Sequence, residues 1–284
     1  MSSAVHSGYA PSTGPRPPAS GSRWPRWLVV ATVAWTVLLA GLTWVSARDD
    51  PPTVREQRTL TQAGPVVDDA IGELVAATAA GVPAMAPPEV DRGCRISPFA
   101  DGATLVRAVE LAVPVGEERG LLERVADRLP ARWRAGVRLT SDGPRLRADA
   151  GEFVTVAGRV VADGRLRFTV DTGCRPLGDG YLGGAAGPDG AEASALAEAL
   201  DALDSPATDP VVVSAPCPGG GLARTGRSVA GSATTPPAAL APLAGGTPVV
   251  QTPELYAYRR DGVAVLADLG QNPVLLHATT GCAG

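Results

Sequence analysis

Four cysteines are the residues of this chain whose spacing says most about their chemistry. They are Cys94, Cys174, Cys217 and Cys282, separated by 80, 43 and 65 residues. A zinc or redox site usually contains two cysteines close together, and this chain has no C-x-x-C motif. An even number of widely spaced cysteines instead indicates two disulfides formed in an oxidising compartment.

Three connectivities are possible for four cysteines, and the order of the flanking elements favours one of them. Cys94 and Cys217 each precede a predicted strand, whereas Cys174 and Cys282 each close a later one. If those strands are antiparallel neighbours, the start of one lies beside the end of the other, within reach of a disulfide. The sequence therefore predicts the pairs Cys94–Cys174 and Cys217–Cys282.

The motif Asp171-Thr172-Gly173 follows an apolar strand, as it does in aspartic proteases. In those enzymes two aspartates share one proton, because two like charges so close together cannot both ionise. Counted from the second Thr-Gly-Cys sequence, the equivalent position is Thr279, so this chain lacks a second aspartate. The motif predicts an aspartate that caps a strand end, and not a catalytic group.

The other candidates for nucleophilic or phosphate chemistry are incomplete. His277 is the only histidine after the N-terminal apolar run, and it stands among apolar residues. Ser228 lies in GRSVAG, which does not match the G-x-S-x-G elbow. The glycine-rich run at 218–221 lacks the G-K-[ST] of a phosphate loop. We expect no catalytic residue, no cofactor site and no metal site.

A single apolar segment places the chain in a membrane. Residues 27–47 carry no charge and would span about 31 Å as a helix, close to the hydrocarbon thickness of a bilayer. Tryptophans flank the segment, as is common at membrane interfaces. The preceding residues 1–26 are rich in Pro, Ser and Gly and cannot bury enough surface to fold. The sequence predicts a transmembrane helix at 27–47 that contacts the lipid bilayer, and a disordered cytoplasmic tail.

Charge alone does not fix the orientation of this helix. Three arginines flank it on each side, but Arg23 and Arg26 lie directly against its N-terminal end. With the cysteines, this favours a cytoplasmic N-terminus and an extracytoplasmic C-terminal region. The alternative is a secreted protein cleaved near Ala47, because Val45-Ser46-Ala47 resembles a signal-peptidase site.

The region after the helix contains two similar halves. Each ends in an apolar strand followed by Thr-Gly-Cys, at Cys174 and at Cys282. In each, a helix-like run stops 14 residues before the first cysteine, near Ala80 and near Leu203. The order helix, linker, cysteine, strand, short helix and strands therefore occurs twice, which predicts an internal duplication.

Hydrophobic periodicity assigns the elements of each half. Leu121, Val125 and Leu129 recur every four residues and predict an amphipathic helix that Pro130 ends. Alternating residues on both sides of Asp163-Gly164 predict a hairpin, and 255–280 reads as a three-stranded meander. We therefore expect an α+β fold: one transmembrane helix, then two similar units, each an antiparallel sheet with covering helices and one disulfide.

The domain boundaries and the function follow from these assignments. The expected segments are a tail at 1–26, the transmembrane helix at 27–47, a membrane-proximal linker and helix at 48–90, a first unit at 91–176, and a linker helix with a second unit at 177–284. The net charge of −4 argues against a nucleic-acid partner. We expect a non-catalytic, membrane-tethered extracytoplasmic binding or assembly module of the bacterial cell envelope, whose partner is another envelope protein or polymer. The alternatives are an extracytoplasmic hydrolase and a sensor ectodomain that signals through a partner.

Overall fold

The computed structural model describes residues 26–49, 58–187, 189–206, 209–230, 236–271 and 273–282. The chain divides into two compact units, Met1–Thr53 and Val54–Gly284. The predicted tail before residue 26, the linker at 50–57 and part of the turn at 270–272 lie outside the described residues.

The described part of the first unit is one helix, α1 (Arg26–Asp49). Its segment Arg26–Trp44 has a mean hydropathy of 1.8 and is long and apolar enough to cross a membrane. A membrane anchor and a secretory signal both meet this description. The predicted apolar helix is therefore present, and its boundaries enclose residues 27–47.

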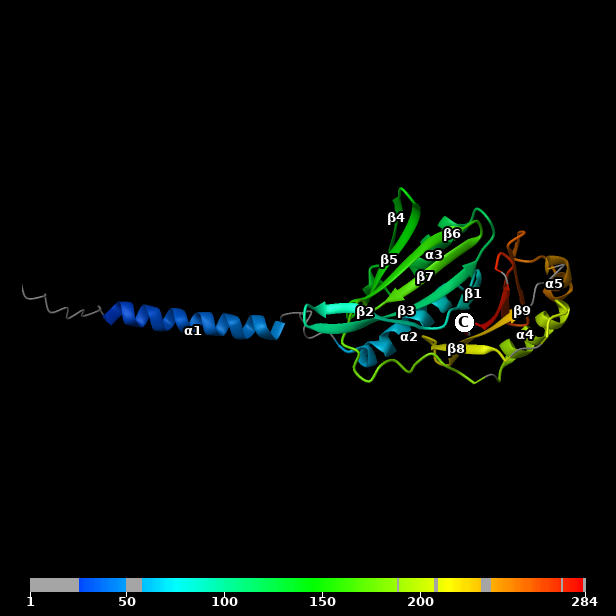
Figure 1. Ribbon diagram of the computed structural model, residues 1–284. Helices are drawn as coiled ribbons and strands as arrows, with labels where there is room; N and C mark the ends of the chain where they lie inside the picture. The colour runs from blue at the N-terminus through cyan, green and yellow to red at the C-terminus, as the bar shows by residue number, and fades with distance from the viewer. Residues whose placement is uncertain are drawn as a thin grey trace, which may run out of the picture. The chain divides into compact units, whose positions relative to one another are not determined.

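The second unit begins with a helix and a seven-stranded antiparallel sheet (Figure 1). Its elements in chain order are α2 (Leu60–Ala77), β1 (Val82–Met85), β2 (Glu89–Ser97), β3 (Ala100–Ala112), α3 (Glu118–Arg128), the 3₁₀ turn η2 (Ala131–Trp133), β4 (Gly136–Thr140), β5 (Gly143–Gly151), β6 (Val154–Ala162) and β7 (Arg165–Asp171). The strand order is β1-β3-β7-β6-β5-β4, and β2 pairs with the first part of β3. We call this the first sheet.

The rest of the unit forms a six-stranded antiparallel sheet, the second sheet. Its elements are α4 (Ala191–Ala202), β8 (Val211–Pro216), β9 (Leu222–Ala230), α5 (Pro236–Ala244), β10 (Val250–Gln251), β11 (Leu255–Arg260), β12 (Val263–Asp268) and β13 (Val274–Thr280). The strand order is β10-β11-β12-β13-β9-β8. The α+β class with two antiparallel sheets is confirmed.

The two halves share one topology. The second half runs helix, edge strand, long strand, helix and then four strands, and the first half has the same order with one extra strand, β2, between its edge strand β1 and its long strand β3. In each sheet the edge strand is followed in space by the long strand, the last strand, and then the remaining strands in reverse order. The first helix of each half packs on the long strand and the last strand, α2 on β3 and β7 and α4 on β9 and β13.

The hydrophobic core explains which sheet faces are covered. Helices α2 and α3 bury one face of the first sheet, and α4 and α5 bury one face of the second (Figure 1). The other face of the second sheet packs against α2 and against the β1–β3 edge of the first sheet. Gly72 permits this contact, because a Cβ there would lie 1.7 Å from the carbonyl oxygen of Pro216. The face of the first sheet that does not pack against α2 and α3 is not covered in this way over β4–β7. We call it the open face.

Some element boundaries differ from the prediction. Pro65 suits the first turn of a helix and therefore predicts a start near residue 65, but helix α2 begins at Leu60, because Thr59 and Gln62 form a capping box. Pro65 then lies inside the helix, beyond its first turn, and its missing amide hydrogen removes one backbone hydrogen bond. The first sheet starts at Val82, ahead of the predicted boundary at residue 91, and strands β1, β2, β4, β5, β8 and β10 were not predicted.

Candidate functional site

The structure contains two disulfides, Cys94–Cys174 and Cys217–Cys282, with Cα–Cα distances of 5.9 and 5.6 Å. These are the pairs that the sequence predicts, but the geometry differs from the predicted one. Each bond crosses over the long strand, β3 or β9: one joins β2 to the segment after β7, and the other joins the residue after β8 to the segment after β13. Gly102 lies opposite Cys94 on β3, and a Cβ there would come within 2.7 Å of the sulfur of Cys174.

Asp171 stands at the end of β7 and caps a turn. Its Oδ1 accepts a hydrogen bond from the backbone N–H of Gly173 at 2.6 Å. Its cross-strand neighbours are Thr155 and Val106, so the register places no acid opposite it. The equivalent Thr279 is buried and hydrogen-bonded to Thr225 at 2.9 Å. This geometry is that of a capping residue.

His277 and Ser228 lie on adjacent strands but on opposite faces of the second sheet. His277 pairs in register with Arg227, and Ser228 pairs with Leu276. Because successive residues of a strand point to opposite faces, the imidazole and the hydroxyl point away from each other. These two residues therefore cannot form a nucleophile–base pair.

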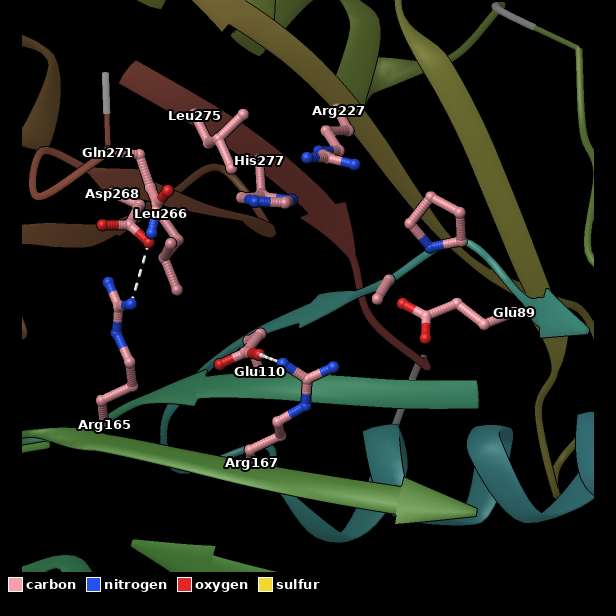
Figure 2. A pocket seen from close by; sticks show the side chains of 12 residues that line it. Glu89, Glu110, Arg165, Arg167, Arg227, Leu266, Asp268, Gln271, Leu275 and His277 are labelled. Carbon is pink, nitrogen blue, oxygen red and sulfur yellow. Dashed lines mark hydrogen bonds and ion pairs between the residues drawn. The ribbon is translucent and has the colours of Figure 1, made fainter. Parts of the chain in front are cut away.

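The face of the second sheet that carries His277 borders a cleft of about 300 Å³ between the two sheets. Figure 2 shows the charged and polar side chains that line it, from β2, β3 and β7 on one side and from β9, β12 and β13 on the other. Arg165 forms an ion pair with Asp268 at 2.8 Å and so joins the two sheets. Arg167 forms a second pair with Glu110 at 3.0 Å. These two ion pairs therefore stabilise the walls of the cleft.

Burial changes the protonation of the groups in this cleft. It raises the pKa of Glu110, against the lowering effect of Arg167. Burial, and after it the positive charge of Arg227, lowers the pKa of His277 to about 4. The imidazole is therefore neutral at pH 7. Nδ1 of His277 and Nε of Arg227 are buried and have no hydrogen-bond partner among the described residues.

The open face of the first sheet carries a row of arginines that sequence analysis did not identify. Cross-strand register pairs Arg138 with Arg145, Arg145 with Arg159, and Arg159 with Arg167. The row thus runs straight across β4, β5, β6 and β7. A fifth arginine, Arg147, lies two residues beyond Arg145 on the same face.

Most of this row is uncompensated. In the described part of the chain, Arg138, Arg147 and Arg159 have no carboxylate within ion-pairing distance. Arg145 pairs with Asp142 at 3.1 Å beside the β4–β5 turn, and Arg167 pairs with Glu110. The sequence holds only a partial signal for this surface. Alternation in R-L-R at 145–147 and 165–167 shows that these arginines share a parity, but the alignment across four strands depends on tertiary register.

The arrangement suits recognition of anions. Guanidinium groups bind carboxylate and phosphate with two parallel hydrogen bonds. Within the described residues, no three His, Cys, Asp or Glu side chains gather in a way that could hold a metal ion. Comparisons with protein-family models, with curated proteins and with solved structures gave no match for this chain.

Proposed function

We propose that residues 58–282 form a non-catalytic, extracytoplasmic binding module of the bacterial cell envelope, tethered to the bilayer by α1 with the N-terminus in the cytoplasm. The observation that carries this proposal is the open face, a solvent-exposed sheet surface on which three arginines form no ion pair with the described acidic residues. Surface charges without ion pairs do not stabilise the fold, but they can attract and orient a partner of opposite charge.

The two disulfides support the extracytoplasmic placement. They close 80 and 65 residues of sequence, and such bonds persist in oxidising compartments. All four cysteines follow α1, so a cytoplasmic tail before α1 and an oxidised module after it agree with one crossing of the membrane.

The state of the titratable groups supports a binding role over a catalytic one. Glu110 and Asp268 are each paired with an arginine, which leaves neither as a free general base. His277 is neutral and pairs in register with Arg227, and none of the described carboxylates forms a hydrogen bond with it. Asp171 is engaged by a turn. The groups that could react are thus occupied or isolated.

We further propose that the two halves arose by duplication of one α+β unit. Their element order and strand order agree, and each disulfide occupies the same place in its sheet. Each half also ties its first helix to its long strand with a carboxylate–arginine pair: Asp68–Arg107 in the first, Glu192–Arg224 in the second. A binding face retained on one copy and packed away on the other would follow from such an origin.

The placement is tested by fusing a reporter that is active only outside the cytoplasm after Gly284. The fusion should be active, and N-terminal sequencing of the membrane fraction should find an uncleaved chain. A silent fusion, together with activity of a cytoplasmic reporter at the same position, would overturn the proposed function.

Binding is tested by solubilising membranes and purifying the full-length protein with whatever it holds. The variant Arg138→Gln/Arg147→Gln/Arg159→Gln should lose an envelope component that the unchanged protein retains. Arg92, an exposed arginine of β2 without an ion pair among the described residues, provides the control substitution Arg92→Gln. Equal recovery from the triple variant and from the control would count against the open face as the binding site.

A further inference from the structure

We infer that the open face binds a linear polyanion, a chain of repeated phosphate or carboxylate groups, which lies across strands β4 to β7. This inference rests on the proposed function, since it names the ligand class of the same surface. The carrying observation is the straight register row Arg138, Arg145, Arg159 and Arg167.

The geometry of the row matches an extended ligand. Neighbouring strands in a sheet lie about 4.8 Å apart, so four arginines in direct register span about 14 Å in a nearly straight line. Each guanidinium extends from a fixed backbone position and can bind one anionic group. A single phosphate or carboxylate would engage one or two of these arginines, whereas a chain of anionic groups engages all four.

The arrangement is unfavourable for the folded protein on its own. Like charges directly opposite each other on adjacent strands destabilise a sheet. Arg159 is the extreme case, because it is flanked by Arg145 on one side and Arg167 on the other and forms no ion pair among the described residues, although the charge of Glu110 acts on it from beyond ion-pairing distance. An anionic chain across the row would remove this repulsion.

The open face also has space for a ligand chain. A hollow of about 220 Å³ is lined by Arg145, Arg147, Arg159 and Arg167, and a second of about 450 Å³ by Arg134, Arg138, Arg145 and Arg147. The two hollows share Arg145 and Arg147 and therefore adjoin each other. Short side chains, Ala157 and Thr169, lie in the register row next to Arg159 and Arg167 and also line the first hollow.

These features favour a polymer over a membrane surface. A protein that inserts into a bilayer interface presents large apolar side chains beside its basic residues. Apart from Leu146, the residues other than arginine that line the 220 Å³ hollow are small or polar, and a hollowed surface accepts a chain better than a flat bilayer. Acidic residues define the limits of the row: Glu110 pairs with Arg167 at its inner end, Asp142 with Arg145 near the β4–β5 turn, and Asp149 with Arg134.

The first test is direct binding by full-length protein in phosphatidylcholine nanodiscs. Two probes separate the anion types: long-chain inorganic polyphosphate and polygalacturonate. The inference predicts that at least one binds, with a slope of log affinity against log salt of about −3, as expected when about four anionic groups are neutralised on a single-stranded polyanion. Tripolyphosphate, which is too short to span the row, should bind at least tenfold more weakly.

The second test is the variant Arg159→Glu. It replaces two like-charge neighbours with two opposite-charge neighbours, so the melting temperature should rise by about 1–4 °C. Affinity for the polymer should nevertheless fall at least about tenfold, because the centre of the row becomes repulsive. A loss of binding in a variant that is more stable cannot be ascribed to misfolding. Arg92→Glu changes the net charge equally and should leave affinity within about twofold.

The remaining outcomes separate the two proposals. If neither polymer binds but the triple variant still loses its envelope component, the polyanion inference is overturned and the proposed function stands. If both Arg159→Glu and Arg92→Glu lose affinity equally, binding reflects net charge only and the inference fails.

Co-flotation with phosphatidylglycerol vesicles in place of polymer binding would assign the face to lipid. Self-association abolished by Arg159→Glu would assign it to a second copy of the chain. Both results would overturn the inference.

Discussion

The first and second sheets share a strand order. The equivalent face is open in the first sheet and packed against the other sheet in the second. Arg167 and Leu275 each lie seven residues before the closing cysteine of their half. From these two anchors, register aligns the row Arg145–Arg159–Arg167 of the first sheet with Leu255–Asp268–Leu275 of the second. One row is open and basic, and the other lines the contact between the sheets.

The contrast shows that packing, and not topology, decides what a sheet face carries. In the second sheet, Leu255 and its neighbours are buried against β1 and the end of β3, and the one acid of the row, Asp268, is paired with Arg165. In the first sheet Arg145 and Arg159 meet solvent, where long charged side chains are tolerated, and Arg167 pairs with Glu110 beside the cleft between the sheets. A surface released from packing can hold a binding function at little cost to the core.

The largest expected effect concerns the two disulfides, one in each half. Each closes 80 or 65 residues of sequence, and removing both should cost about 8 kcal/mol in a chain-entropy estimate. This approaches the whole stability of a domain. Reduction should therefore unfold both halves, as measured by circular dichroism melts with and without reductant.

The connectivity itself can be checked by peptide mapping without reduction. A Cys94–Cys217 or Cys174–Cys282 linkage would contradict both the pairing and the proposed duplication. The paired variants also distinguish the halves. Cys217→Ala/Cys282→Ala should cost more than Cys94→Ala/Cys174→Ala, because the Cys217 side chain belongs to the core packed on α2.

The next effect concerns the two helix–strand ion pairs. Arg107 is fully buried and forms an ion pair with Asp68 at 2.5 Å, and its Nη2 donates to the carbonyl oxygen of Ser214. Asp68→Asn leaves this buried charge without its counter-ion and should cost about 3–5 kcal/mol. In the second half Arg224 reaches solvent and also donates to two carbonyl oxygens, so Glu192→Gln should cost only about 1–2 kcal/mol. Urea unfolding of both variants measures the difference, and a larger loss for Glu192→Gln would show that the pairs are not comparable.

A third prediction concerns pH. His277 has a titratable side chain, whereas Thr169, at the equivalent position of the first sheet, has none. The pKa of His277 is lowered from 6.5 to about 4, so the unfolded chain binds a proton in this range and the folded protein does not. Stability is therefore full above about pH 6.5 and falls as the pH drops toward 4, by at most about 3 kcal/mol.

The variant His277→Gln should flatten this part of the stability profile. The difference between the variant and the unchanged protein isolates the histidine, since the raised pKa of Glu110 in the same cleft acts with the opposite sign. Denaturant unfolding at several pH values makes the measurement. An unchanged slope between pH 6.5 and 4 would mean that His277 titrates normally.

The smallest expected effect is the exchange Arg145→Leu, which installs the residue of the equivalent position in the second sheet. Because Arg145 lies on an open face with only a surface ion pair, unfolding free energy should change by no more than about 0.5 kcal/mol. The reverse exchange, Leu255→Arg, is the control, since it puts a charge without a partner into the contact between the sheets. Similar effects for the two exchanges would remove the distinction between open and packed faces.

Several elements were predictable because their signals are local. The hairpin around Asp163-Gly164 and helix α3 ending before Pro130 follow from periodicity and turn chemistry, and both are observed. The start of α2 was also readable, since Thr59 and Gln62 form a capping box signature, but the proline at 65 directed the prediction to a later start. Strands β1, β4, β8 and β10 were missed because they are short segments whose pairing partners supply most of their definition. The nine-residue strands β2 and β5 were missed as well.

The sequence by itself determined the local features: an apolar helix, widely spaced cysteines after it, and two runs of elements ending in Thr-Gly-Cys. These depend on residue type and on neighbours within a few positions of the chain. Only the tertiary structure decided the rest. Register between strands aligned Arg138, Arg145, Arg159 and Arg167 into one row, and the packing of the β1–β3 edge on the second sheet left that row uncovered. Both depend on contacts between residues far apart in the chain, which the local pattern does not encode.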